Sequence, residues 1–203
     1  MLDKNPNQVL NEAFVKLKIE FSDKNPIIIL SSKPFVKSEF LINLINSLNV
    51  PVIFFDFDLL YSGYINSGMI KKNEKVKILR PNEKDFQRHL KEVVEKISKE
   101  RVLVILDSLN VLYNMFENLD SFRFTNATIM LLASIAKTTK SHIIVTSMVT
   151  KNEKKEWILS PGGKHLIESK KSGMYYLDNS ESNLVLNSLN KKREKDNSFI
   201  IKN

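Results

Sequence analysis

Apolar residues along this chain follow two kinds of pattern. Short uninterrupted runs are typical of strands buried on both faces, as in a parallel sheet, whereas apolar residues spaced three or four positions apart predict amphipathic helices. The runs predict strands at 27–30, 52–57, 75–79, 102–106, 142–146, 174–177, 184–187 and 199–201, and the helical spacing predicts helices at 7–20, 40–48, 85–99 and 126–138. Strands and helices alternate up to residue 146 and strands alone follow, so we predict an α/β fold with a mainly parallel central sheet, flanking helices and antiparallel C-terminal strands.

The remaining segments predict loops within a single domain. The loop 58–69 contains Tyr61 and Tyr64, for which packing against a sheet edge is favoured over contact with a ligand or partner. The stretch 116–124 is predicted to be irregular and the stretch 151–164 to be a polar, basic loop. No internal repeat or low-complexity linker divides the chain, so we predict one domain over residues 1–203, with a leading helix in 1–24 and the core in 25–203.

Composition narrows the classes of function. The chain has no cysteine, and its three histidines are far apart in the sequence, so we expect no thiolate chemistry and no metal site. The first residues lack the order of a signal peptide and no apolar run is long enough to span a membrane, so we expect a cytoplasmic protein without a membrane partner. The net charge of +8 favours polyanions, nucleic acid first, although solvated lysine-rich faces give the same balance.

The most apolar strand, in the stretch RVLVILDSL, runs directly into Asp107 and Ser108. An ionisable residue at the end of a buried strand lies at the carboxyl edge of the sheet, where ligands of open α/β sheets bind. Asp107 is therefore the first candidate site residue. The alternative is that Asp107 only caps the following turn, a position that favours aspartate in any case.

An altered phosphate-binding loop follows the first predicted strand. The order strand, loop, Lys-Ser, helix is that of a P-loop, G-x-x-x-x-G-K-[ST], but the corresponding residues here are SSKPFVKS, which keep Lys37 and Ser38 and lack both glycines. A P-loop holds phosphate with successive backbone N–H groups in unusual backbone conformations. Because Val36 is β-branched and Pro34 has no N–H, we expect ordinary nucleotide triphosphate binding to be lost.

Taken in order, these stretches resemble the RecA/RadA recombinase superfamily, and within it the RadB-like and KaiC-like core domains. The family's first strand and Walker A loop are matched by IIILSSKPFVKS, its carboxylate-bearing strand by VIFFDFD, and its Walker B strand by RVLVILDSL. Its sensor strand is matched by HIIVTSMV, with Ser147 or Met148 at the sensor position. The segment after its second DNA-binding loop and its closing hairpin are matched by PGGKHLIESKKSGMYYL and LNKKREKDNSFII. The resemblance implies a RecA-like P-loop NTPase fold.

The resemblance also implies roles for individual residues. Lys37 and Ser38 would belong to the nucleotide site, with Lys37 on the terminal phosphates, and Asp107 would assist magnesium. Asp58 would orient water in place of the family's usual glutamate, one methylene longer, and the missing glycines alter the same site. We therefore interpret Asp58 and Asp107 as relic catalytic positions in a pseudo-ATPase with no cofactor, in which ATP and magnesium bind only if the altered loop still accepts them.

Basic residues gather in the last third of the chain. Lysines and arginine beside an aromatic side chain suit single-stranded nucleic acid, because phosphates meet the charges and bases stack on the ring. The candidate nucleic-acid-binding residues are Lys151, Lys154, Lys155, Trp157, Lys164, Lys170, Lys171, Lys191, Lys192 and Arg193. The alternatives are that Trp157 anchors its loop on the core and that the lysines form a solvated face.

The leading hypothesis is a non-hydrolysing RecA-like recombinase paralogue. It would bind single-stranded DNA and a partner recombinase, as an accessory in homologous recombination and DNA repair, and it is compatible with an oligomer. A second hypothesis is a KaiC-like protein-binding scaffold or signalling pseudo-ATPase without DNA binding, favoured by the K-x-R pattern of Lys191 and Arg193. A third is a weak ATPase with an unorthodox loop, favoured by the retained Lys37, Ser38 and Asp107.

Overall fold

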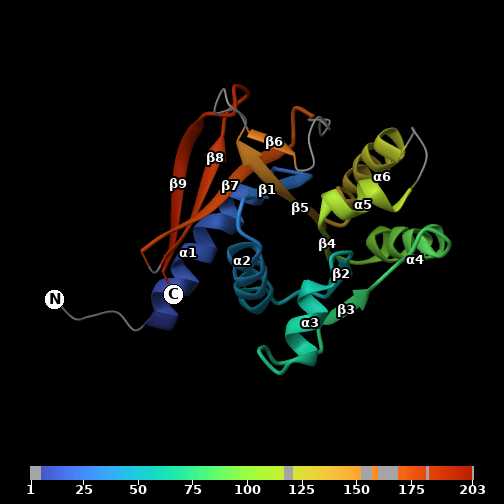
Figure 1. Cartoon of the computed structure of the whole chain (residues 1–203), viewed down its shortest axis with the longest axis horizontal. Coiled ribbons are helices and arrows are strands. Elements are labelled where there is room, and N and C mark those ends of the chain that lie inside the picture. Colours follow the sequence, from blue (N-terminus) through green and yellow to red (C-terminus); the bar gives the residue numbers. More distant parts are fainter. Residues whose placement is uncertain (1–5, 117–120, 152–156, 160–168, 182, 203) are drawn as a thin grey trace.

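The computed structural model describes residues 6–116, 121–151, 157–159, 169–181 and 183–202 (Figure 1). Its helices are α1 (Pro6–Phe21), α2 (Pro34–Ser47), α3 (Leu60–Asn66), α4 (Phe86–Lys99), α5 (Leu109–Met115) and α6 (Ser121–Ala136). Its strands are β1 (Ile27–Ser31), β2 (Val52–Asp56), β3 (Val76–Leu79), β4 (Leu103–Asp107), β5 (His142–Lys151), β6 (Trp157–Leu159), β7 (Gly173–Ser180), β8 (Asn183–Leu189) and β9 (Lys195–Lys202). The predicted α/β class is confirmed.

The described strands form one sheet in the order β3-β2-β4-β5-β1-β7-β8-β9, with β6 paired to the end of β5. The pairs from β3 to β7 are parallel, and β8 and β9 extend the sheet in antiparallel pairs. The carboxyl ends of β1, β2, β4 and β5 therefore meet at one edge of the sheet. The predicted mainly parallel sheet with antiparallel C-terminal strands is confirmed.

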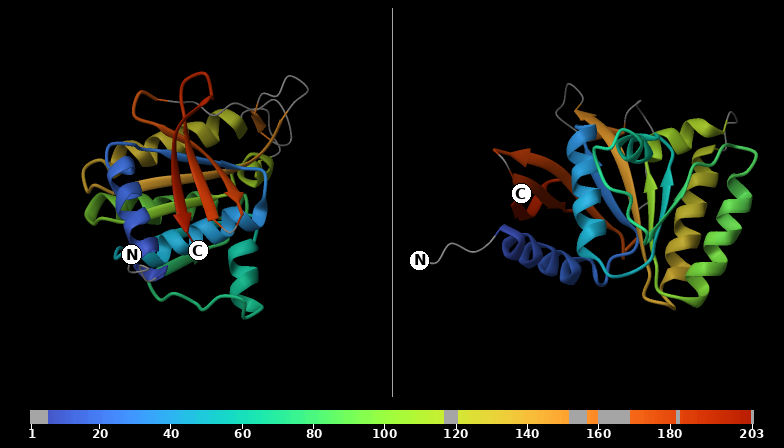
Figure 2. Two further views of the ribbon diagram at one scale, coloured as in Figure 1. Left: turned by 90° about the vertical axis from the view of Figure 1, so that its left-hand side faces the viewer. Right: turned by 90° about the horizontal axis from the view of Figure 1, so that it is seen from below.

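Neighbouring residues of each central strand face opposite layers of helices. Ile28 and Leu30 of β1 belong to the core that includes α4, α5 and α6, whereas Ile27 and Ile29 belong to the core that includes α1, α2 and α3. Figure 2 shows helices on both sides of the sheet. Because both faces of the central strands are covered, their residues are apolar throughout rather than alternating with polar ones.

Helix α2 begins about two turns earlier than the apolar spacing predicts. It starts at Pro34, which occupies the first helical turn, whereas the sequence pattern placed the helix at 40–48 and a loop before it. Proline is favoured at the first position of a helix because its fixed φ suits the helix and its missing N–H would have no intrahelical partner there. Without glycines to hold a phosphate-binding loop open, these residues take the helical conformation.

Several predicted loops are also regular structure. The segment 58–69 contains α3, the stretch after Asp107 contains α5, and α6 begins at Ser121 rather than at residue 126. Strand β5 extends to Lys151, and β6 lies inside the predicted basic loop. The helices α3 and α5 have seven residues each, too few for a period of 3.6 to be recognised in the sequence.

Across the described residues, the helices are too short or too polar to cross a lipid bilayer.

Candidate functional site

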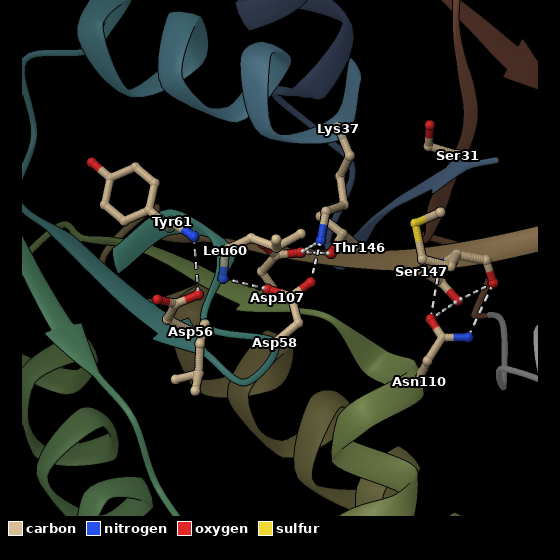
Figure 3. Close-up of polar contacts among 12 residues, drawn as sticks. Ser31, Lys37, Asp56, Asp58, Leu60, Tyr61, Asp107, Asn110, Thr146 and Ser147 are labelled. Carbon is tan, nitrogen blue, oxygen red and sulfur yellow. Dashed lines mark hydrogen bonds and ion pairs between the residues drawn. The ribbon is translucent and has the colours of Figure 1, made fainter. Parts of the chain in front are cut away.

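A buried cluster of charges occupies the carboxyl edge of the sheet. We call it the Lys37 cluster, and it consists of Lys37 on α2, Asp58 after β2, Asp107 at the end of β4 and Thr146 on β5 (Figure 3). The Lys37 Nζ atom lies 2.5 Å from Asp107 Oδ1 and 2.6 Å from Asp58 Oδ2. The Thr146 hydroxyl donates a hydrogen bond to Asp107 Oδ1 as well. The structure thus brings together three of the residues that the sequence singled out.

Burial sets the charges of this cluster. The side chain of Lys37 is fully buried, and that of Asp107 is nearly so. Burial lowers the pKa of Lys37, but the two carboxylates raise it, so that its pKa lies above the usual value and the ammonium stays charged. Burial raises the pKa of Asp107 to about 6, against the opposing effect of Lys37. Two carboxylates therefore surround one cation, and the ion pairs satisfy the cation inside the protein.

The residues that correspond to a P-loop do not form a phosphate cradle. The Lys37 N–H donates to the Lys33 carbonyl at 3.1 Å, as in any helix, and none of residues 31–38 has the positive φ that such a loop needs. The Lys33 ammonium instead binds Asp178 at 3.2 Å and Asn179 at 2.6 Å on the β7 side of the loop. The glycine-free sequence has therefore closed the loop by extending the helix.

A third carboxylate stands beside the cluster with partners of its own. One oxygen each of Asp56, Asp58 and Asp107 can be chosen so that all three lie within 4.8 Å of one another, a grouping of the kind that divalent cations bind. However, Asp56 accepts hydrogen bonds from the Ser62 hydroxyl and N–H and from the Tyr61 N–H, which hold the start of α3.

The groups that magnesium and nucleotide would need are thus committed elsewhere. The ammonium of Lys37 already stands between Asp58 and Asp107. The Ser38 hydroxyl, the relic magnesium ligand, is buried without a hydrogen-bond partner among the described residues and lies on another face of α2. This arrangement does not fit magnesium with a nucleotide triphosphate.

The predicted sensor position is fixed by a residue that the sequence analysis missed. Asn110 on α5 accepts hydrogen bonds from the Ser147 hydroxyl at 3.1 Å and the Met148 N–H at 2.7 Å, and it donates to the Met148 carbonyl at 3.0 Å. This amide holds the backbone of β5 where β4 has ended. The signal in the sequence was only that Asn110 follows Asp107 by three residues, and without α5 that spacing indicates nothing.

The predicted nucleic-acid-binding residues divide between opposite ends of the sheet. Strand register sets Lys151, at the carboxyl end of β5, opposite Trp157 on β6. Lys170 and Lys171 precede β7, whose start pairs with the start of β1 at the amino end. The Lys191, Lys192 and Arg193 turn joins β8 to β9 at that same end. The remaining candidates, Lys154, Lys155 and Lys164, lie outside the described residues.

Further basic residues extend the second group. Arg101 and Lys140 precede β4 and β5, so they lie at the same amino end of the sheet as Lys170, Lys171 and the β8–β9 turn. Arg101, Lys140, Lys170, Lys171, Lys191 and Lys192 are exposed, and we call these six residues the amino-end strip. Adjacent strands are about 4.8 Å apart, so the strip follows the edge of the sheet from β4 to β8.

Comparison with known proteins identifies the fold. No protein-family model matches the chain, and no curated protein does either. The solved structures do. A RadB recombinase crystal structure matches with a TM-score of 0.58 and 13% identity over 91% of this chain and 90% of that one. The structure of an isolated ATPase domain matches with a TM-score of 0.56 and 13% identity over 94% of this chain and 82% of that one.

A third match is a DnaB-like replicative helicase, described with its interactions with primase. Its TM-score is 0.54 with 12% identity, over 98% of this chain and 64% of the helicase chain, so this chain spans less than two thirds of that protein. What a recombinase, an ATPase domain and a helicase have in common with this chain is the order of strands and helices around the sheet. The chain has the fold of the RecA-like P-loop NTPase core.

Proposed function

We propose that this protein is a non-hydrolysing RecA-like recombinase paralogue that binds single-stranded DNA and a partner recombinase. As an accessory protein it would act in homologous recombination and DNA repair, and it would work in the cytoplasm. The observation that supports the loss of hydrolysis is the Lys37 cluster, in which the relic phosphate-binding lysine is held by Asp58 and Asp107.

The energy of the cluster favours the locked state. Removing one partner of a buried ion pair typically costs about 3–5 kcal/mol, because the other charge stays buried without compensation. A nucleotide that drew Lys37 toward its phosphates would leave Asp58 and Asp107 facing each other beside the negative charges of the phosphates. With no cradle of backbone N–H groups to add binding energy, we propose that ATP does not compete with the two carboxylates.

The basic residues support nucleic acid as the ligand. The amino-end strip presents six exposed cations, and none of them forms an ion pair with a described residue. Cations that lack partners release condensed counterions from a phosphate backbone on binding, which makes binding strong at low salt. The β5–β6 pair offers a second region, because its register sets a basic residue, Lys151, opposite an aromatic one, Trp157, on which a base could stack.

Titration of fluorescent single-stranded DNA, at low and moderate salt and with and without Mg-ATP, tests this proposal. We expect salt-sensitive binding that ATP does not change. Lys170→Glu with Lys171→Glu tests the amino-end strip, and Trp157→Ala tests the β5–β6 region. Every phosphate interaction that a charge-reversed lysine no longer makes should reduce the salt slope by about 0.7. Lys77→Glu is a matched control, since Lys77 is an exposed lysine of β3 away from both regions.

Two other results would each replace the proposal. Binding of DNA only when ATP is present would favour a weak ATPase with an unorthodox loop. Absence of DNA binding under every condition would favour a protein-binding scaffold or signalling pseudo-ATPase of the KaiC-like kind, and the search would move to its partner.

A further inference from the structure

A groove runs along the side of α2 that faces away from the Lys37 cluster. Its walls are α2 on one side and α3 with the following segment on the other, and its volume is about 550 Å³. Cavities of this size are typical of binding sites in proteins. The lining residues, mostly apolar, are Phe35, Ser38, Glu39, Ile42, Asn43, Tyr64, Met69 and Ile70. We call it the α2–α3 groove.

The walls of the groove are held in place. The Tyr64 carbonyl accepts hydrogen bonds from the Met69 N–H at 3.0 Å and the Ile70 N–H at 3.3 Å, which fold the segment after α3 back toward the helix. The rings of Phe35 and Tyr64 lie 6.3 Å apart between centroids, one from each wall. The groove is therefore present before anything binds to it, which reduces the ordering cost of binding.

Two of its polar groups lack partners. The Ser38 and Tyr64 hydroxyls are buried without a hydrogen bond to any described residue, and the Ser38 side chain is almost wholly buried. An unsatisfied buried hydroxyl is unfavourable, and native proteins keep few of them. A Ser hydroxyl turns about a single bond and the Phe35 ring above it is exposed, so an occupant with donor and acceptor groups can reach these oxygens.

Two large apolar side chains on the rim are left in solvent. Phe35 is 74% exposed and Met69 is 73% exposed, and they come from opposite walls. Along α2 the lining positions recur three and four residues apart, so the groove follows the helix for two turns, about 12 Å. An elongated apolar surface of this kind suits an amphipathic helix, whose anchors recur with the same spacing, and exposed methionine adapts to such partners.

Charge distinguishes the two walls. Lys71 and Lys72 follow the lining residue Ile70 and are exposed; Lys71 forms no ion pair with a described residue, and Lys72 has only Glu74 at 3.9 Å. The α2 wall carries Glu39. An occupant with an acidic residue is thus attracted at the lysine wall and repelled at the α2 wall, which fixes its orientation.

We propose that the α2–α3 groove binds an amphipathic helical segment of a partner protein, with apolar anchors against Phe35 and Met69 and an acidic residue against Lys71 and Lys72. The main-chain or side-chain polar groups of that segment complete the hydrogen bonds of Ser38 and Tyr64. This inference rests on the proposed function only in that a partner protein is part of it.

A peptide selection on the intact protein tests the chemistry of the occupant. The probe is a phage-displayed library of peptides of about 12 residues, three helical turns. We expect the selected peptides to carry apolar residues at helical spacing and an acidic residue toward one end. A synthetic selected peptide should lose about tenfold or more in affinity for Phe35→Ala and for Met69→Ser, as measured by fluorescence anisotropy.

Matched variants separate the groove from general stickiness. Lys71→Glu with Lys72→Glu should weaken the peptide, whereas Lys99→Glu, on the exposed end of α4, should not change it. Leu131→Ala removes an exposed leucine of α6, on the other layer of helices, and should not change it either. All of these positions are exposed, so the variants are expected to fold.

Selected peptides that bind Phe35→Ala as well as the wild type, or that show no acidic preference, would overturn the inference. So would a selection that yields no binder. Neither DNA nor nucleotide is present in this experiment, so its failure is distinguishable from failure of the DNA titration.

Discussion

Two consecutive residues of α2, Lys37 and Ser38, face sites of opposite character. The Lys37 cation is fully buried and bonded to two carboxylates, so every strong interaction that it needs comes from within the chain. The Ser38 hydroxyl, one position later, is buried with no partner among the described residues and lies beside an apolar groove with exposed rims. One face of the helix is complete, and the other has unused binding capacity.

The difference shows where this fold keeps structure and where it leaves room for interaction. The polar site at the carboxyl edge of a RecA-like sheet has become a structural cluster, because its lysine and carboxylates neutralise one another. The neighbouring surface is apolar, unsatisfied and open. Each prediction below changes one side of this contrast, and they are ordered from the largest expected effect to the smallest.

Lys37→Met should cause the largest loss of stability. Methionine fills a similar volume without the charge, so Asp58 and the buried Asp107 would face each other uncompensated, at a cost of about 3–5 kcal/mol. Urea unfolding followed by circular dichroism measures it. Lys33→Met is the control: this lysine is 52% exposed, its partner Asp178 lies on the surface, and the change should cost less than about 1 kcal/mol.

A double variant tests whether the cost comes from the stranded carboxylate. Adding Asp107→Asn to Lys37→Met removes the uncompensated charge and should restore part of the lost stability. If Lys37→Met and Lys33→Met cost the same, the cluster does not stabilise the fold in the way we describe.

The pKa of Asp107 should be found near 6 by following its carboxyl carbon signal in an NMR titration. Because the pKa is raised in the folded state, protonation of Asp107 favours folding. Its stabilising contribution is complete below the unfolded pKa of about 3.9 and is lost as the pH rises through about 6. Relative to Asp107→Asn, the free energy of unfolding should thus fall by up to about 3 kcal/mol over that window. A titration midpoint at or below about 4 would contradict the burial argument.

Ser62→Ala tests a hydroxyl that has a partner. The Ser62 hydroxyl donates to the buried Asp56 carboxylate, so its loss leaves that carboxylate with one hydrogen bond fewer, at a cost of about 1–3 kcal/mol. Urea unfolding at neutral pH measures the change. A neutral effect would mean that the Ser62 N–H alone is enough to hold Asp56.

Ser38→Ala tests a hydroxyl that has none and should have the smallest effect. Alanine removes an unsatisfied polar atom and has the higher helix propensity, so the variant should match the wild type or gain up to about 1 kcal/mol. The same unfolding experiment compares it directly with Ser62→Ala. A loss of about 2 kcal/mol would show that the Ser38 hydroxyl is already bonded within the free protein.

The sequence predicted the sheet far better than it predicted the site. The central strands were recognised because both faces are buried and their residues are apolar throughout, and the helix α4 because its apolar residues keep one face. Asp107 was located because it ends the most apolar strand. These are local signals, and local patterns reveal them.

What the sequence missed depends on contacts between distant residues. The comparison with a P-loop placed a loop where Pro34 in fact begins a helix, so the early start of α2 was overlooked. The direction of Lys37 is set by carboxylates 21 and 70 residues away. Asn110 gained its role from a seven-residue helix that carries no clear period, and the α2–α3 groove exists only once α3 stands beside α2.

The central claim is that Lys37 is committed to Asp58 and Asp107 and does not serve a nucleotide. Calorimetric titration of the purified protein with ATP and magnesium tests it most directly, with Lys37→Ala measured in parallel. Our account predicts no heat of binding for either protein beyond dilution. Stoichiometric binding of ATP by the wild type that Lys37→Ala abolishes would contradict it, since the lysine would then leave its carboxylates for the phosphates.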